Sequence, residues 1–222
     1  SLACPETRLA VRIQRAVKPE PLPTIFGWHT CRDDEFAIML LLSATGLRLA
    51  PSHLASNFSF HSRLPARVPL KQKHLRPEEV QVERDKIYLT FTLSDGDQLM
   101  MMDTGELGNW RRPERGKVPF NWETQPMLAE LAPALLGLFY ASLTPNDYLI
   151  AGPSGAGYII PPLNGDLDAY LSHTAETCRK ADIRVVTSYS ADPPLRTVRQ
   201  HLHMPGDMIG FLAGYAHFGR TP

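Results

Sequence analysis

Three carboxylic acids stand at the ends of predicted strands, and they are the residues in this sequence best suited to proton transfer. Asp95 and Asp97 flank Gly96 in the stretch LSDGD, and Glu123 follows Trp122 in FNWET. Two close carboxyl groups can share a proton, which splits their pKa values, or can hold a hard cation such as Ca²⁺ or Mg²⁺. An apolar neighbour raises the pKa of a carboxyl group, as a general acid requires, so Trp122 favours Glu123 as the acid. A pair of carboxyl groups is typical of glycosidic-bond chemistry.

A glycine-rich bend, SGAGYIIPPLNGD at residues 154–166, is the second candidate region. Gly155 and Gly157 permit backbone angles closed to other residues and leave room for a ligand beside the main chain. In one interpretation, Ser154, both glycines and Tyr158 line a binding cleft. In the other, Tyr158 packs in the core and the glycines only make the turn. A phosphate-binding loop is disfavoured, because no Lys follows the glycines and no helix begins directly after them.

Aromatic and polar side chains follow the other predicted strands as well. Trp28 and Trp122 offer flat faces that can stack on sugar rings, and His29 comes directly after a strand. Further polar residues also follow predicted strands directly, although loop residues are polar in any case and many cap helices. These residues are Asp33, Asp34, Glu35, His53, Asn57, Gln98, Ser188, Tyr189 and Asp192.

The histidines offer a competing interpretation of the same carboxyl groups. With Asp95 or Asp97, the side chains of His29, His53 and His61 could form a metal site like that of carbohydrate deacetylases. No HxxxH pair is present, however, and we predict no metal ligand among the histidines. A divalent cation at Asp95 and Asp97 is the one cofactor that stays open.

These residues must be positioned by elements that alternate along the chain. Strands are predicted at 24–28, 47–51, 86–97, 118–124, 147–155, 183–190 and 208–215, with 86–97 the strongest because of its β-branched and aromatic residues. Helices are predicted at 32–46, 125–143, 166–182 and 193–204. Pro133 should kink or restart the second helix, and Asp166 should cap the third.

Alternating strands and helices predict an α/β fold with a largely parallel sheet. We favour an irregular or incomplete (β/α) barrel with six to seven mostly parallel strands over the alternative, an open doubly wound sheet. In both architectures, function lies at the carboxyl ends of the strands. We therefore expect one concave surface to collect Asp95, Asp97, Glu123, Gly155 and Tyr158.

Composition narrows the class of protein. The 222 residues are 43% apolar and 21% charged, with zero net charge, so there is no electrostatic footprint for nucleic acid. The longest apolar run, FAIMLLL, is too short to span a membrane. The three cysteines lack zinc-like spacing and are interpreted as buried thiols.

Three segments carry a resemblance to a known family. PTIFGWHTCRDDEF, YLTFTLSDGDQL and the long stretch from FNWETQ to YIIP resemble the glycoside hydrolase family named for its GxGYxYP motif. The motif maps onto Gly155, Gly157, Tyr158, Ile160 and Pro161, where Ile160 replaces the second tyrosine. The family's SDGDN element maps onto residues 94–98, where Gln98 replaces Asn and lengthens the side chain by one methylene.

The resemblance implies a carbohydrate substrate and a location outside the cytoplasm, either extracellular or periplasmic. It also implies that residues 1–23 are a linker from a preceding N-terminal domain, and that 24–222 form a GxGYxYP-like domain that is truncated at its C-terminus. Three functions stay open: glycoside hydrolase through Asp97 and Glu123, metal-dependent deacetylase, and non-catalytic carbohydrate-binding or scaffold domain. The substitutions at Ile160 and Gln98 lend the last some weight.

Overall fold

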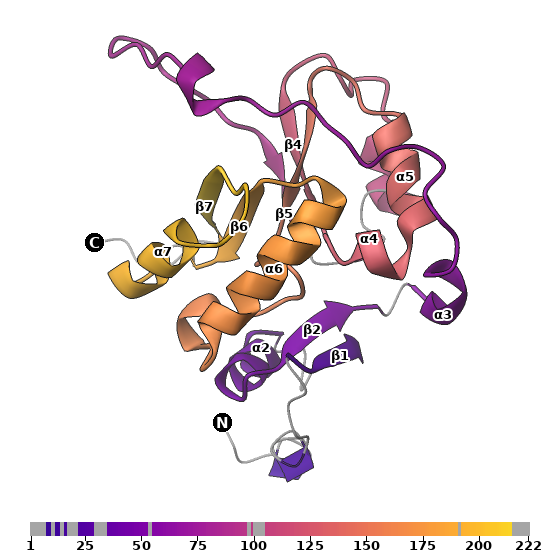
Figure 1. Cartoon of the computed structure of the whole chain (residues 1–222), viewed down its shortest axis with the longest axis vertical. Helices are drawn as coiled ribbons and strands as arrows, with labels where there is room; N and C mark the ends of the chain where they lie inside the picture. Colours follow the sequence, from indigo (N-terminus) through magenta and orange to yellow (C-terminus); the bar gives the residue numbers. More distant parts are fainter. Residues whose placement is uncertain are drawn as a thin grey trace.

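A five-stranded parallel sheet, strongly curled into a half-barrel, forms the centre of the molecule (Figure 1). The computed structural model describes residues 8–9, 12–13, 16, 22–28, 35–52, 55–96, 99, 105–190 and 192–214. The strands are β3 (Thr92–Leu93), β4 (Phe120–Thr124), β5 (Asp147–Ala151), β6 (Val185–Tyr189) and β7 (Gly210–Gly214), in that spatial order. The order follows the sequence without the reversal of a doubly wound sheet, so the incomplete (β/α) barrel is confirmed.

Helices cover the outer face of this sheet (Figure 1). They are α4 (Leu128–Leu131), α5 (Pro133–Ala141), α6 (Leu167–Ala181) and α7 (Leu195–Leu202). Pro133 restarts the helix as predicted, and the side chain of Asp166 accepts a hydrogen bond from the Ala169 amide at the start of α6. The core between sheet and helices contains Trp122, Leu136, Leu149, Tyr170 and Cys178, among others. Burial raises the pKa of the Cys178 thiol to about 12, in agreement with a buried, unreactive thiol.

A separate βαβ unit packs beside the half-barrel. It consists of β1 (Thr24–Gly27), α2 (Glu35–Ala44) and β2 (Arg48–Pro51), and its two strands pair in parallel. An antiparallel bridge between Leu49 and Tyr158 joins this unit to the segment that follows β5. A second apolar cluster, which includes Met39, Leu42 and Tyr158, seals the contact. The unit therefore rests on the glycine-rich bend.

The long segment between β2 and β3 straps across the half-barrel and carries a short helix, α3 (Phe58–His61). The side-chain amide of Gln72 donates to the Leu149 carbonyl at 3.0 Å and accepts from the Leu149 amide at 2.9 Å. Strands β5 and β6 pair only at Ala151 and Val186, so Gln72 takes the place of a missing strand partner. The Gln72 backbone amide also donates to Asp182 at 2.8 Å.

The segment predicted as the strongest strand is mostly not a strand. Only Thr92–Leu93 pairs with β4, and Ile87 and Leu89 are 89% and 77% exposed. Residues 86–91 run beyond the edge of the sheet, in an arm that projects from the molecule (Figure 1). High β-propensity means a side chain suited to a packed sheet, and it does not supply the neighbouring strand. The prediction of a strand over 86–97 is therefore wrong over most of its length.

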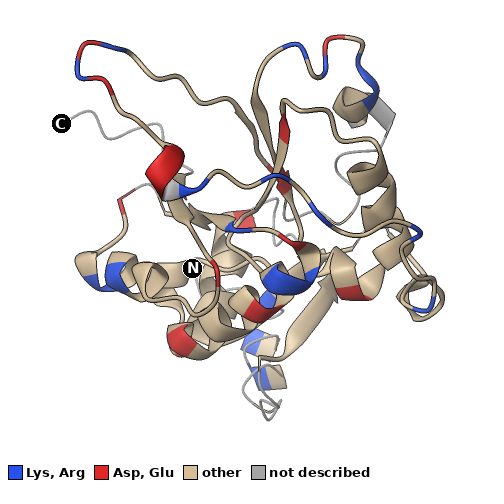
Figure 2. Ribbon diagram, turned by 45° about the horizontal axis from the view of Figure 1, so that its top comes forward, with Lys and Arg blue, Asp and Glu red and all other residues tan. Residues whose placement is uncertain are grey.

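The surface carries both signs of charge, with Lys and Arg interspersed among Asp and Glu (Figure 2). Within the described ranges, none of the helices has the length and apolar character needed to cross a bilayer.

Asp147, at the start of β5, is buried, and its carboxylate binds residues of neighbouring segments. Its carboxylate accepts hydrogen bonds from the Trp122 indole at 2.9 Å and from the Thr144 amide at 2.9 Å, and it forms an ion pair with Arg115. The Arg115 guanidinium also lies over the Trp110 ring, 4.3 Å from its centroid. One buried carboxylate thus connects β4, β5 and the loop before β4.

We predict that Asp147→Asn lowers the free energy of unfolding by about 3 kcal/mol, because it leaves the half-buried Arg115 charge without its buried counter-charge. Urea denaturation followed by circular dichroism measures this. The exposed Asp85→Asn is the control and should change stability by less than about 0.5 kcal/mol. Equal effects of the two substitutions would contradict the role given to Asp147.

Candidate active site

Glu123 occupies a tight space at the carboxyl end of β4. The residue is 2% exposed, and the Gly96 amide donates to its Oε2 at 3.4 Å. A Cβ atom on Gly96 would overlap the backbone of Glu123, and one on Gly152 would lie 2.7 Å from its Cδ. Glycine backbone that follows β3 and β5, the strands on either side of β4, therefore encloses this carboxyl group.

Trp122 points away from Glu123. Side chains alternate along a strand, and Trp122 faces the helices, where it packs against Trp110 with ring centroids 5.0 Å apart. The expectation that Trp122 forms an apolar wall beside Glu123 is wrong, because these neighbours lie on opposite faces of β4. Trp122 is 4% exposed, and its predicted contact with a substrate stays a prediction.

Asp95 precedes Gly96 in the loop after β3, on the same rim as Glu123. Its backbone has a positive φ of 68°, a conformation that Asp and Asn adopt more readily than most residues. The residue is exposed, but nearby protein atoms remove part of the solvation of its carboxyl group and so raise its pKa. The predicted partners Asp97 and His29 lie outside the described residues, as do Gln98 and His53.

The glycine-rich bend is buried and held by side chains from four other segments. The Ser154 hydroxyl donates to the Ile159 carbonyl and accepts from the Tyr189 amide, both at 2.9 Å. Gly155 has φ 133° and lies against Thr174, and Gly157 has φ 98° and lies against Arg48.

Four side chains bind the backbone groups of Ala156 and Gly157 in this bend. Arg48 donates to the Ala156 carbonyl at 2.8 Å, and Tyr170 donates to the Gly157 carbonyl at 2.6 Å. Thr174 accepts from the Ala156 amide at 3.1 Å, and Gln125 accepts from the Gly157 amide at 3.1 Å. The glycines thus allow close packing within the protein. The predicted substrate contacts of Ser154, Gly155 and Gly157 stay predictions.

Tyr158 packs its ring in the core, as in the second of the two interpretations of the bend. The residue is 2% exposed and its ring meets that of Tyr189 edge-on, with centroids 5.2 Å apart. Its hydroxyl donates to Oε1 of Glu35, the first residue of α2, at 2.8 Å. Trp28, half-buried after β1, packs against the same cluster.

Glu35 is the residue that sequence reasoning did not single out. Its place after a strand puts it among the polar residues of the rim, but acidic residues are also common in the first turn of a helix. The signal that separates the two roles is the contact with Tyr158, which joins residues 123 positions apart. Nothing in the sequence pattern specifies that contact.

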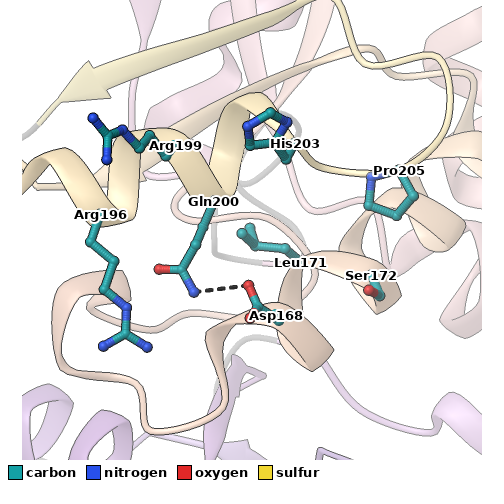
Figure 3. A pocket seen from close by; sticks show the side chains of 8 residues that line it. All are labelled: Asp168, Leu171, Ser172, Arg196, Arg199, Gln200, His203 and Pro205. Carbon is teal, nitrogen blue, oxygen red and sulfur yellow. Dashed lines mark hydrogen bonds between the residues drawn. The ribbon is translucent and has the colours of Figure 1, made fainter.

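Two of the hollows on the described surface lie away from Glu123. One of about 470 Å³ opens between α6 and α7, where Gln200 donates to Asp168 at 2.8 Å and Arg196, Arg199 and His203 surround them (Figure 3). Another, of about 370 Å³, is lined by Phe120, Trp122 and residues of the loop before β4. Neither is lined by Glu123 or Asp95, so the candidate site is the rim with its enclosed carboxyl group.

Within the part of the chain that the structure describes, no group of three His, Cys, Asp or Glu side chains is placed to hold a metal ion. A cation at Asp95 and Asp97 would use one residue outside that part, so it stays a prediction.

Comparison with known proteins adds two findings. A family model described as the GxGYxYP putative glycoside hydrolase C-terminal domain matches residues 85–219. The crystal structure of a putative hydrolase from Bacteroides thetaiotaomicron is similar, with a TM-score of 0.81 and 28% sequence identity over 95% of this chain. The match spans 41% of the length of that solved protein. A search of curated proteins found no match.

We predict that Gly96→Ala lowers the free energy of unfolding by roughly 3 kcal/mol or prevents folding, because its methyl group would overlap the Glu123 backbone. Thermal unfolding measures this. Gly165→Ala is the control, since nothing lies within 4 Å of its Cβ position. Wild-type stability in Gly96→Ala would show that Glu123 is not enclosed as described.

A pH-dependent effect is expected from Asp95. Folding raises its pKa above the ordinary 3.8, so stability is fully present below that value and falls as pH rises through the raised pKa. Asp95→Asn stays neutral and tolerates the positive φ, so it should be more stable than wild type at pH 7 and not at pH 3. Urea denaturation at both pH values measures the difference. The same difference at pH 3 and pH 7 would refute the effect.

Proposed function

Because this chain belongs to the family described as the GxGYxYP putative glycoside hydrolase C-terminal domain, we propose that it hydrolyses glycosidic bonds of a poly- or oligosaccharide by carboxylate acid–base chemistry. The observation that carries the proposal is the enclosed carboxyl group of Glu123 at the carboxyl end of β4. In parallel (β/α) folds, residues at that end of the strands carry the chemistry. Burial of a carboxyl group costs solvation free energy, and a functional role accounts for the retention of such a group.

Glu123 is the proposed general acid. It donates its proton to the oxygen of the leaving sugar as the bond from that oxygen to the anomeric carbon breaks. Asp97 is the second carboxyl group, with Asp95 in support. It either activates the water that attacks the anomeric carbon or attacks that carbon itself, and water then releases the sugar. The Gly96 amide would keep the Glu123 carboxyl group oriented through this cycle.

A carbohydrate-binding domain without turnover is the second candidate function. The observation in its favour is that the glycine-rich bend uses its polar groups within the protein, as with the Ser154 hydroxyl. The departures from the family motif at Ile160 and Gln98 point the same way. The match spans 41% of the similar solved protein, so we further propose that an N-terminal domain of the same polypeptide completes the substrate cleft.

Substitution of Glu123 tests hydrolysis directly. We expect Glu123→Gln to reduce the release of reducing ends from a glycan panel by about 10²- to 10⁴-fold while sugar binding persists, because the amide is nearly isosteric but cannot donate the proton. The exposed Glu176→Gln is the control and should keep wild-type activity. Unchanged activity in Glu123→Gln would place the acid elsewhere. Binding without turnover in the wild type would favour the second function.

Asp97→Asn extends the same experiment to the second carboxyl group. We expect a loss similar to that of Glu123→Gln, because the variant can neither accept a proton nor form a covalent intermediate. Partial recovery on addition of Ca²⁺ or Mg²⁺ would instead identify Asp97 as a cation ligand. Full activity without added metal would exclude both roles.

A further inference from the structure

We propose that Glu35 is a sugar-binding carboxylate of the rim, and that Tyr158, the tyrosine of the family motif, positions it rather than touching the sugar itself. The inference rests on the proposed function, since it assigns a further binding residue to the same substrate. Its starting point is the hydrogen bond of 2.8 Å from the Tyr158 hydroxyl to Oε1 of Glu35.

The contacts of Tyr158 fix the position of Glu35. Its ring is packed among Ile38 and Leu42 of α2 and Leu49 of β2, and it meets the Tyr189 ring edge-on. The helix that carries Glu35 therefore packs on the tyrosine ring and binds the hydroxyl of the same residue. This double contact fixes the carboxylate relative to the bend, as a substrate-binding group requires.

Glu35 itself remains accessible. It is exposed at the first position of α2, and among the described residues Tyr158 is its hydrogen-bond partner, at one carboxylate oxygen. Trp28 and Tyr189 are half-buried and pack against the cluster around Tyr158. An accessible carboxylate beside partly exposed aromatic rings suits a sugar, whose hydroxyls donate to the carboxylate while its C–H face packs on a ring.

The bend links this place to Glu123. Gly152, two residues before the bend, packs against the Glu123 side chain, and Tyr158, within the bend, binds Glu35. The segment from Gly152 to Tyr158 therefore contacts both carboxyl groups, Glu123 of β4 and Glu35 of α2. The motif tyrosine and glycines then have a shared role, which is to position carboxylates.

The charge of Glu35 also selects the class of substrate. A carboxylate accepts hydrogen bonds from neutral sugar hydroxyls but repels a uronic acid, which carries a like charge. We therefore assign the site to neutral oligosaccharides with free hydroxyl groups.

Calorimetry with cellohexaose, xylohexaose, mannohexaose, chitohexaose and hexagalacturonate tests this on the whole chain. We expect at least one neutral hexasaccharide to bind and hexagalacturonate to bind more weakly. Glu35→Gln should weaken that binding about 10- to 100-fold, because hydrogen bonds to a charged group are the strong ones. Tyr158→Phe should weaken it about 10-fold, and adding it to Glu35→Gln should cost no more than Glu35→Gln alone, because Tyr158 acts through Glu35.

Tyr170→Phe is the matched control. It also deletes one buried phenol hydrogen bond, to the Gly157 carbonyl in the same bend, but Tyr170 does not contact Glu35. It should lower the unfolding midpoint in urea and leave the affinity for the hexasaccharide unchanged. If Tyr170→Phe weakens binding as much as Tyr158→Phe, the tyrosine has a general structural role and the inference fails.

The remaining outcomes are equally decisive. Unchanged affinity in Glu35→Gln, or a preference for hexagalacturonate, would overturn the inference while leaving the proposed hydrolysis intact. Binding that depends on Glu35 with no release of reducing ends would overturn the proposed hydrolysis and support the inference. Wild-type protein that neither binds nor cleaves any of the five probes would overturn both.

Discussion

The close approach of glycine backbone to the Glu123 carboxyl group is the constraint on which the rest of the rim depends. A Cβ atom at Gly96 or Gly152 would overlap Glu123. The loops after β3 and β5 can therefore approach Glu123 this closely only because both positions are glycine. Burial of a carboxyl group removes it from water and makes its protonation sensitive to its surroundings. The rim is thereby shaped around one acid, with Asp95 directly beside the glycine that approaches it.

The glycine-rich bend connects the surroundings of Glu123 to the βαβ unit. After Gly152, the Ser154 hydroxyl accepts a hydrogen bond from the Tyr189 amide, and Gly157 packs against Arg48 of β2. Tyr158 then pairs with Leu49 of β2 in an antiparallel bridge. The half-barrel and the unit of β1, α2 and β2 are thus joined by a segment with little conformational freedom. In the proposed function, its residues serve binding indirectly by positioning Glu35 and Glu123.

Much of the fold could be predicted from the sequence because local patterns and elementary topology agree. Pro133 divides a helical pattern, Asp166 begins a helix, and strands alternate with helices in the order of a barrel. The arm at 86–91 could not be predicted, because propensity reports the side chains and not whether a neighbouring strand exists. The pairing of Trp122 with Asp147 was equally hidden, since it depends on which face of β4 is covered by helices.

The site was predicted in part, for a similar reason. The rule that parallel strands present function at their carboxyl ends placed Glu123 and Asp95 on one rim, where the structure has them, without any distance information. The same rule included Glu35 without distinguishing it, because the contact that holds it comes from Tyr158, far along the chain. A motif read as a ligand-binding loop proved to be tightly anchored within the protein, as close-packed glycines often are.

A crystal structure of the Glu123→Gln variant soaked with the neutral oligosaccharide that it binds best would test the central claim most directly. We predict a glycosidic oxygen within about 3 Å of the amide nitrogen at position 123, the reach of a hydrogen bond from a general acid. Sugar density confined to the hollow between α6 and α7, with the side chain at position 123 untouched, would contradict it.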